Sequence, residues 1–326
     1  MQESQSVQEA AADATTKSNR SALLIVFLVV FIDLLGFGIV LPLLPRYGDD
    51  FLQDLVPGGK DSALGGGILG LLLSSFSLMQ FIFAPLWGRI SDRIGRRPIL
   101  LLGLAGSVVF YTLFGFASDM TDKALGLTLL FIARTGAGIA GATISTAQAV
   151  IADCTPPKKR SHGMALIGMA FGIGFTFGPI IGALSLKLLP HFRGAPGFAA
   201  AGLSLIAAVL GFLLLPETWR AGSQAGRRDW LDWRGLQNAL RMPVVGLLIV
   251  IFFLATFAFA NFEATLSLVT KEAFNITDDD NYWIFAFVGF VLMIAQGLIY
   301  RRLAMRVKET AFMKVGLVLM IVGLAA

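Results

Sequence analysis

Nine long apolar stretches divide this sequence, and short polar or charged segments separate each stretch from the next. A helix needs about 20 apolar residues to cross the hydrocarbon core of a bilayer, and each stretch approaches that length. The pattern therefore predicts an all-α membrane protein whose spans lie at residues 22–44, 64–87, 99–117, 125–152, 164–189, 198–215, 244–270, 282–300 and 311–326.

The composition agrees with this fold class. Of the 326 residues, 56% are hydrophobic and 14% are charged, whereas a soluble domain carries about 25% charged residues. The net charge of +5 could suit nucleic acid, but the basic residues lie between the spans, so we expect a topology signal and no nucleic-acid partner. Cys154 is the single cysteine, which excludes a disulfide within the chain, and the two histidines lie in different loops, so no metal site is expected.

The distribution of lysine and arginine predicts the orientation in the membrane. With a cytoplasmic N-terminus, nineteen of these residues lie on the inner side and six on the outer side. This excess predicts that the N-terminus is cytoplasmic, because cytoplasmic loops are enriched in basic residues. Asn275 then opens an Asn-Ile-Thr sequon on the outer side, where a glycan acceptor must lie in a eukaryote. The expected location is a plasma or organelle membrane, which the chain crosses several times.

The chain is expected to have four parts. Residues 1–20 are polar and are expected to form a disordered cytoplasmic tail, followed by an N-terminal six-helix bundle at 21–216. Residues 217–243 form a cytoplasmic linker in which Trp and Leu recur at helical spacing among arginines, as in a helix lying on the inner leaflet. An ordinary solvated linker is the alternative. Residues 244–326 supply three helices of a second, partial bundle.

Two charged residues lie deep within predicted spans. Asp33 falls midway along the first span, where a carboxylate costs about 3 kcal/mol unless it faces a wet cavity or a partner. It is therefore a candidate proton-binding group, with a helix–helix hydrogen bond as the structural alternative. Arg134, in the fourth span, keeps its proton, so it could tune a nearby acid, hold an anionic solute, or form a structural ion pair with Asp33.

A third candidate, Glu263, is the only acid within the seventh span. It lies toward the outer half of that span. Contact with the solute or the proton is one interpretation, and exposure to the outer vestibule is the other.

Two glycine-containing motifs accompany these residues. The segment Gly88–Pro98 between the second and third spans contains four arginines and one acid, so it must form a turn at the membrane surface. The fifth span contains Gly174-x-x-x-Gly178-Pro179-x-x-Gly182, in which glycines four residues apart allow close helix approach and Pro179 kinks the helix.

These strings resemble signatures of the major facilitator superfamily of transporters, closest to the tetracycline-transporter-like proteins of its drug:proton antiporter branch. The loop reads Gly-x-x-x-Asp-Arg-x-Gly-Arg-Arg, and Leu130-x-x-x-Arg134 resembles the fourth-helix motif. The resemblance implies an antiporter hinge at Gly174, Gly178, Pro179 and Gly182. It also implies a cytoplasmic gating network made by Gly88, Asp92, Arg93, Gly95, Arg96, Arg97, Asp153 and Glu217.

One position departs from the pattern of that branch. Tetracycline exporters carry an acid in the third helix, and the matching residue here is Phe110. The resemblance therefore implies a broader amphipathic or anionic organic solute.

The resemblance and the charges within the spans predict transport. The sequence contains no nucleophile–base arrangement or nucleotide-binding glycine loop typical of an enzyme. We expect proton-coupled efflux of a small organic solute by alternating access, with a proton gradient as the energy source. No cofactor is expected, and the lipid bilayer surrounds the protein. The alternatives are a facilitated organic-anion carrier and a non-transporting membrane protein. Since superfamily members have twelve helices and nine are predicted here, we also expect this polypeptide to be a fragment with little activity alone.

Overall fold

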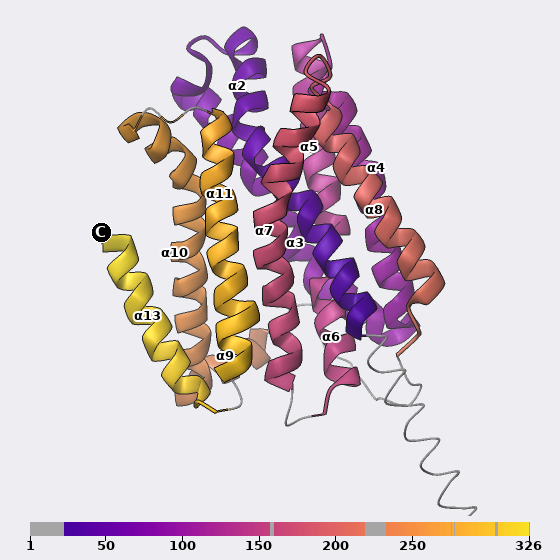
Figure 1. Ribbon diagram of the computed structural model, residues 1–326, viewed down its shortest axis with the longest axis vertical. Coiled ribbons are helices and arrows are strands. Elements are labelled where there is room, and N and C mark those ends of the chain that lie inside the picture. The colour runs from indigo at the N-terminus through magenta and orange to yellow at the C-terminus, as the bar shows by residue number, and fades with distance from the viewer. Residues whose placement is uncertain are drawn as a thin grey trace, which may run out of the picture. The chain divides into compact units, whose positions relative to one another are not determined.

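The computed structural model describes residues 23–156, 160–218, 233–274, 276, 278–303 and 306–325. The described part is helical, and it contains no strand. In chain order its elements are the first span (Leu23–Leu43) ending in η1 (Leu41–Leu43), α2 (Leu44–Leu55), η2 (Gly59–Asp61), α3 (Ala63–Ile94), α4 (Arg96–Ser118), α5 (Lys123–Ala140), α6 (Ile144–Cys154), α7 (Arg160–Leu188), α8 (Ala195–Leu214), α9 (Trp233–Arg241), α10 (Pro243–Phe274), α11 (Asp278–Met293), the π-helical η4 (Ile294–Tyr300), α12 (Arg301–Leu303) and α13 (Glu309–Ala325) (Figure 1).

Membrane-crossing helices are confirmed along most of the predicted pattern. Within the described ranges, eight helices are long and apolar enough to cross a bilayer. The ninth predicted span corresponds to a shorter apolar helix, Thr310–Leu324. The all-helical membrane fold expected from the apolar periodicity is therefore the fold of the chain.

The segment after the first span is helical, although it is one of the polar or charged segments that separate the apolar stretches. Pro42 and Pro45 fall in the first turns of η1 and α2, and each removes one amide donor from a helical path that continues from the first span. The helical path therefore tightens at η1 and continues into α2. This short helix buries Tyr47, Phe51 and Leu52.

The predicted fourth span is a bent pair of helices. A turn at residues 141–143 separates α5 from α6. Two side chains of α3 donate to carbonyl groups at this turn: the Trp87 indole to Ile139 at 2.8 Å and the Gln80 amide to Gly141 at 3.1 Å. A helix can bend inside a membrane when neighbouring side chains satisfy the backbone groups that the bend releases.

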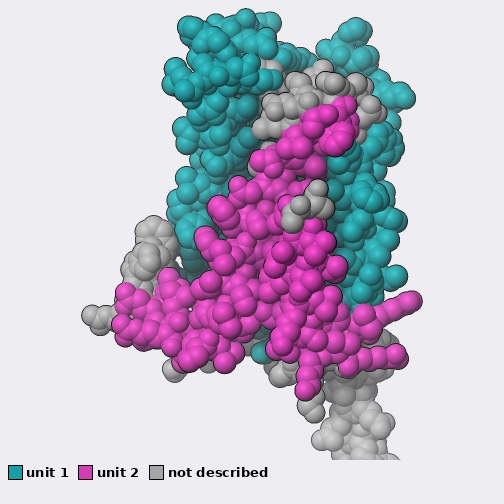
Figure 2. Space-filling model, turned by 90° about the vertical axis from the view of Figure 1, so that its left-hand side faces the viewer, with its two compact units in different colours: residues 1–221, 282–301 teal, residues 222–281, 302–326 magenta. Residues whose placement is uncertain are grey.

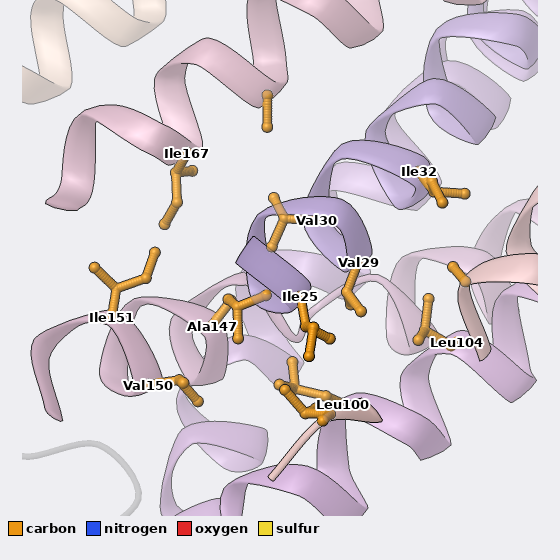
Figure 3. Packing of buried hydrophobic residues seen from close by; sticks show 14 of the residues in the cluster. Ile25, Val29, Val30, Ile32, Leu100, Leu104, Ala147, Val150, Ile151 and Ile167 are labelled. Carbon is orange, nitrogen blue, oxygen red and sulfur yellow. The ribbon is translucent and has the colours of Figure 1, made fainter. Parts of the chain in front are cut away.

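The core of the bundle lies where the first span meets α4, α6 and α7. Ile25, Val29 and Val30 of the first span belong to the same buried cluster as Leu100 of α4 and Val150 of α6 (Figure 3). α4 packs most extensively on α8 and α5. The first span is thus enclosed by other helices, which places its midpoint inside protein.

The chain divides into two compact units. Unit 1 comprises residues 1–221 and 282–301, and unit 2 comprises residues 222–281 and 302–326 (Figure 2). α11 belongs with unit 1 because it packs on α7 through glycines, with Gly172 against Met293 and Gly289 against Thr176.

In unit 2, α9 packs against the start of α10, where Gly246 lies against the Leu240 backbone. Leu236 and Leu240 of α9 are exposed. The predicted interfacial helix is based on Trp230, Trp233, Leu236 and Leu240. All but Trp230 fall in α9, and residues 219–232 lie outside the described residues. The division of the chain into bundles and linker stays a prediction.

Candidate functional site

Asp33 lies inside unit 1 and is partly exposed. Its Oδ1 accepts a hydrogen bond from the Ser107 hydroxyl of α4 at 2.9 Å. Ser107 itself is 1% exposed. The carboxyl group therefore has a polar partner on a neighbouring helix, as an acid within a span needs.

Arg134 of α5 is enclosed more completely, with 2% of the residue exposed. Its guanidinium carbon lies 4.6 Å from the ring centroid of Phe76 and 5.9 Å from that of Phe37. Nε and Nη1 have no hydrogen-bond partner among the described residues. The faces of aromatic rings attract a cation, but they offer no acceptor to the N–H groups that lie in the plane of the guanidinium. The Arg134 guanidinium therefore keeps unused hydrogen-bond donors.

The structural ion pair considered for Asp33 and Arg134 is not among the salt bridges of the described residues. Instead, Tyr111 of α4 is close enough to both charges to interact electrostatically with each. Its ring packs against Gly36, one turn beyond Asp33. The two charges thus share a neighbour without forming a direct contact.

Phe110, the α4 residue that departs from the pattern of the resemblance, has a packing role. A Cβ added at Gly136 would lie 2.1 Å from the Phe110 ring, so Phe110 lies directly against the α5 backbone. Ser107 and Tyr111 are the α4 residues that approach Asp33 and Arg134. Neither residue was predicted as a site residue from the sequence, although their spacing of four places both on one helical face.

The glycine string of α7 packs on the first span. A Cβ added at Gly38 would lie 2.7 Å from the Gly174 carbonyl oxygen, and one added at Gly178 would lie 2.7 Å from Gly38. Gly182 meets Ile39 one turn further on. Only residues without side chains allow two backbones to come this close, so α7 is held against the helix that carries Asp33. Pro179 lies inside α7, at the centre of this contact.

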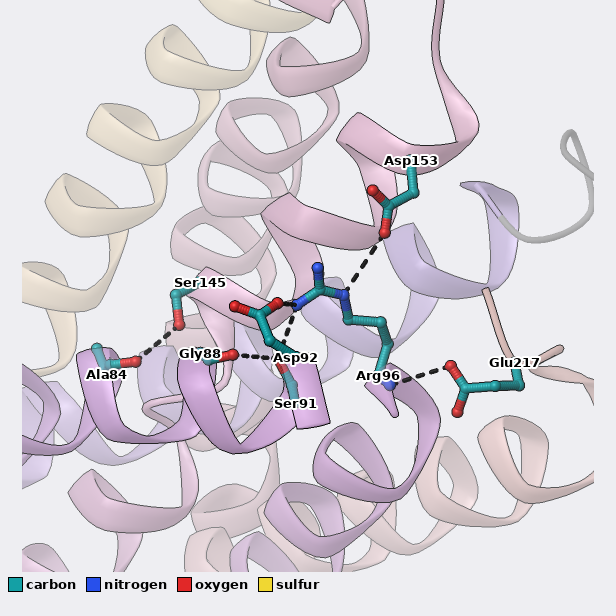
Figure 4. Close-up of polar contacts among 8 residues, drawn as sticks. All are labelled: Ala84, Gly88, Ser91, Asp92, Arg96, Ser145, Asp153 and Glu217. Carbon is teal, nitrogen blue, oxygen red and sulfur yellow. Dashed lines mark hydrogen bonds and ion pairs between the residues drawn. The ribbon is translucent and has the colours of Figure 1, made fainter. Parts of the chain in front are cut away.

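The α3–α4 turn carries the predicted charge network (Figure 4). Arg96 forms ion pairs with Asp92 and, through Nε at 3.5 Å, with Asp153 at the end of α6. It also donates to Ser91 at 2.9 Å. Gly88 accepts a hydrogen bond from Ser91, whereas Arg93 is exposed and joins none of these contacts. The structure therefore brings together the acids and the central arginine, and leaves Arg93 outside.

Glu217 acts on the backbone of the same turn. Its carboxylate accepts hydrogen bonds from the amides of Arg96 at 3.0 Å and Arg97 at 3.2 Å. These are the first amides of α4, which lack partners within the helix. In return, the Arg97 guanidinium donates at 2.5 Å to the carbonyl of Phe212 near the end of α8. The segment after α8 thus caps the start of α4, and Arg97 of α4 caps the end of α8.

Two predicted residues remain without a described environment. Glu263 lies within α10, but its side chain is outside the described residues. Asn275 also lies outside them. Their proposed contacts therefore stay predictions.

The model of the Major Facilitator Superfamily matches residues 26–326 of this sequence. The chain belongs to this superfamily, and it is an integral, multi-pass membrane protein of the transporter class and not an enzyme. It is 34% identical over 330 residues to human major facilitator superfamily domain-containing protein 10, covering 87% of this chain and 68% of that protein. It is also 35% identical over 237 residues to the class E tetracycline resistance protein of Escherichia coli, covering 72% of this chain and 54% of that protein.

A comparison with solved structures gives the same family. The crystal structure of the human organic anion transporter MFSD10 (TETRAN) superposes with a TM-score of 0.68 at 31% identity, covering 87% of this chain and 73% of that one. The chain therefore spans about half of the tetracycline resistance protein's length and about two thirds of the human relative's.

Proposed function

We propose that this protein is a proton-coupled antiporter that exports a small organic solute, with Asp33 as the proton-binding group. The observation that carries the proposal is an acid in mid-span whose carboxyl group has a hydroxyl partner on a neighbouring helix. An acid placed this deep needs a function or a strong structural reason, because burying its charged form is costly. A cycle of protonation and release supplies such a function.

The surroundings of Asp33 support coupled exchange. The glycine contact between α7 and the first span leaves no room for a larger side chain at Gly38, which lies close to Asp33, the proposed proton-binding residue. A tight contact there limits passage of protons without solute. The similarity to tetracycline resistance proteins favours an antiporter, and the basic loops favour a cytoplasmic position for the Asp92 network.

Proton flux into liposomes tests this proposal. A longer, transport-competent version of the protein is reconstituted with a pH-sensitive dye in the lumen, and tetracycline or salicylate is added as the probe solute. We expect solute-driven proton movement that Asp33→Asn abolishes and Asp33→Glu partly retains. Asp50→Asn is the matched control, because Asp50 lies in α2 and pairs with Arg193, away from Asp33. This variant should leave the flux unchanged. Unchanged flux in Asp33→Asn contradicts the assignment.

Facilitated carriage of organic anions is a second candidate function. Arg134 favours it, because a buried guanidinium with two unpaired nitrogens between aromatic rings suits a carboxylate attached to an apolar body. The human relative described as an organic anion transporter also favours it.

Binding of salicylate separates the two candidates. Arg134→Gln should weaken salicylate binding by at least about tenfold, the loss expected from one charge-assisted hydrogen bond. Arg93→Gln, an exposed arginine outside the network, is the control. If salicylate moves down its gradient in Asp33→Asn as fast as in the unaltered protein, carriage without protons is the function.

A further inference from the structure

We infer that Ser107 is the positioning residue of the Asp33 carboxyl group, so that α4 contributes to proton coupling through a hydroxyl at this position and not through an acid. The inference rests on the proposed role of Asp33 as the proton-binding group. It assigns to Ser107 the task of fixing the orientation of that carboxyl in both protonation states.

The direction of the Ser107 hydrogen bond carries the inference. A hydroxyl inside an apolar helix commonly bonds to a carbonyl one turn earlier in its own helix. Ser118 of α4 does so with Phe114 at 2.7 Å, and Thr176 of α7 does so with Gly172 at 2.7 Å. Ser107 instead donates across the helix interface to Asp33. The hydroxyl therefore serves the carboxyl group and not the local backbone.

The packing around Ser107 fixes this contact in place. A Cβ added at Gly36 would lie 2.7 Å from the Tyr111 ring, so the first span and α4 approach each other closely one turn beyond the hydrogen bond. Ser107 is 1% exposed and Tyr111 is 3% exposed. A short side chain at 107 can reach Asp33 only because the helices are held this close.

A serine hydroxyl suits a carboxyl that gains and loses a proton. It can donate to an ionised oxygen, and it can donate to the carbonyl oxygen of the protonated acid. The bond therefore holds one carboxyl oxygen while the proton exchanges at the other. A carbonyl oxygen in place of the hydroxyl could accept a hydrogen bond only from the protonated acid. A backbone amide could not replace the hydroxyl, because it already donates within its own helix.

Infrared difference spectroscopy of the detergent-purified chain, between alkaline and acidic buffer, tests the inference without requiring transport. Asp33→Asn identifies the carbonyl stretching band of the protonated Asp33 by removing it. Ser107→Ala should shift that band to higher frequency, because the carbonyl loses its hydrogen-bond donor. Ser107→Cys, with a weaker donor of similar size, should give a smaller shift in the same direction. Ser118→Ala, the matched buried serine on the same helix, should leave the band in place.

The outcomes separate the inference from the function on which it rests. If no titrating band disappears in Asp33→Asn, then Asp33 is not the proton-binding group and the proposed function fails. If the Asp33 band is present but Ser107→Ala and Ser118→Ala leave it equally unmoved, Ser107 does not position the carboxyl and only this inference is overturned. A loss of folding in Ser107→Ala leaves Ser107→Cys to decide by the same criterion.

Discussion

The two ends of unit 1 hold their charged side chains in different ways. Where α3 meets α4, Arg96 pairs with Asp92 and Asp153, but other charges act on backbone. Glu217 binds two α4 amides and Arg97 binds an α8 carbonyl. At the end where α3 begins, the acids of α2 pair with side chains, Asp50 with Arg193 and Asp54 with Lys123 at 3.8 Å. Charge at the first end therefore fixes helix termini, whereas charge at the second end surrounds an aromatic core.

Aromatic rings occupy the centre of the α2 end. Phe51 is 1% exposed, packs against Gly126 of α5 and lies 5.4 Å below the Lys123 ammonium. Tyr47 donates through its hydroxyl to the Arg193 carbonyl at 2.6 Å and lies under that residue's guanidinium. Since exposed ion pairs contribute little, these rings should provide most of the stability at this end.

The largest expected effect is that of removing the Phe51 ring. Phe51→Ala should lower the free energy of unfolding in detergent by about 3 kcal/mol, because a buried phenyl group is lost and a cavity remains beside Gly126. Phe51→Leu, which keeps most of the volume, should lose about 1 kcal/mol. A loss in Phe51→Ala no larger than that of an α2 charge variant would contradict the comparison.

The next effect concerns the backbone of the opposite end. Gly95 has φ +111°, and a Cβ there would lie 2.5 Å from the Glu217 carboxylate. Gly95→Ala should therefore lower the free energy of unfolding by about 2 kcal/mol, because the backbone conformation is strained and the α4 cap is displaced. Thermal unfolding followed by circular dichroism measures it.

Two further variants refine this measurement. Gly70→Ala adds a methyl group to α3 where a Cβ meets nothing within 4 Å, so no loss is expected. Glu217→Ala should cost about 1 kcal/mol by itself, as for other helix caps. In the Gly95→Ala background, Glu217→Ala should cost less, because the methyl group at residue 95 has already displaced the carboxylate. Additive costs would show that residue 95 and Glu217 do not interact.

The smallest effect is expected at an exposed ion pair. Asp54 is 64% exposed where it faces Lys123, so Asp54→Asn should change the free energy of unfolding by less than about 0.5 kcal/mol. Added salt should remove even this difference by screening the pair. A salt-insensitive loss as large as that of Glu217→Ala would mean that charge stabilises both ends alike.

Much of the fold could be predicted from the sequence, because each membrane-spanning helix corresponds to a long apolar stretch. Each span satisfies its own backbone, so apolar length alone locates it. α2 could not be predicted in this way, because it is a short helix at residues 44–55 in which charged residues alternate with apolar ones. The bend at 141–143 escaped it too, because the groups that stabilise the bend, Gln80 and Trp87, lie on another helix.

The sequence by itself determined the class of the protein, the two charges within the spans and the glycines that let α7 meet the first span. Each depends on a residue type that is costly or rare inside an apolar helix. Only the tertiary structure decided the partners. It paired Asp33 with Ser107 and placed Arg134 between aromatic rings, and it gave Phe110 a packing role. A hydrogen bond between helices depends on their rotation and separation, which the local pattern of either helix does not contain.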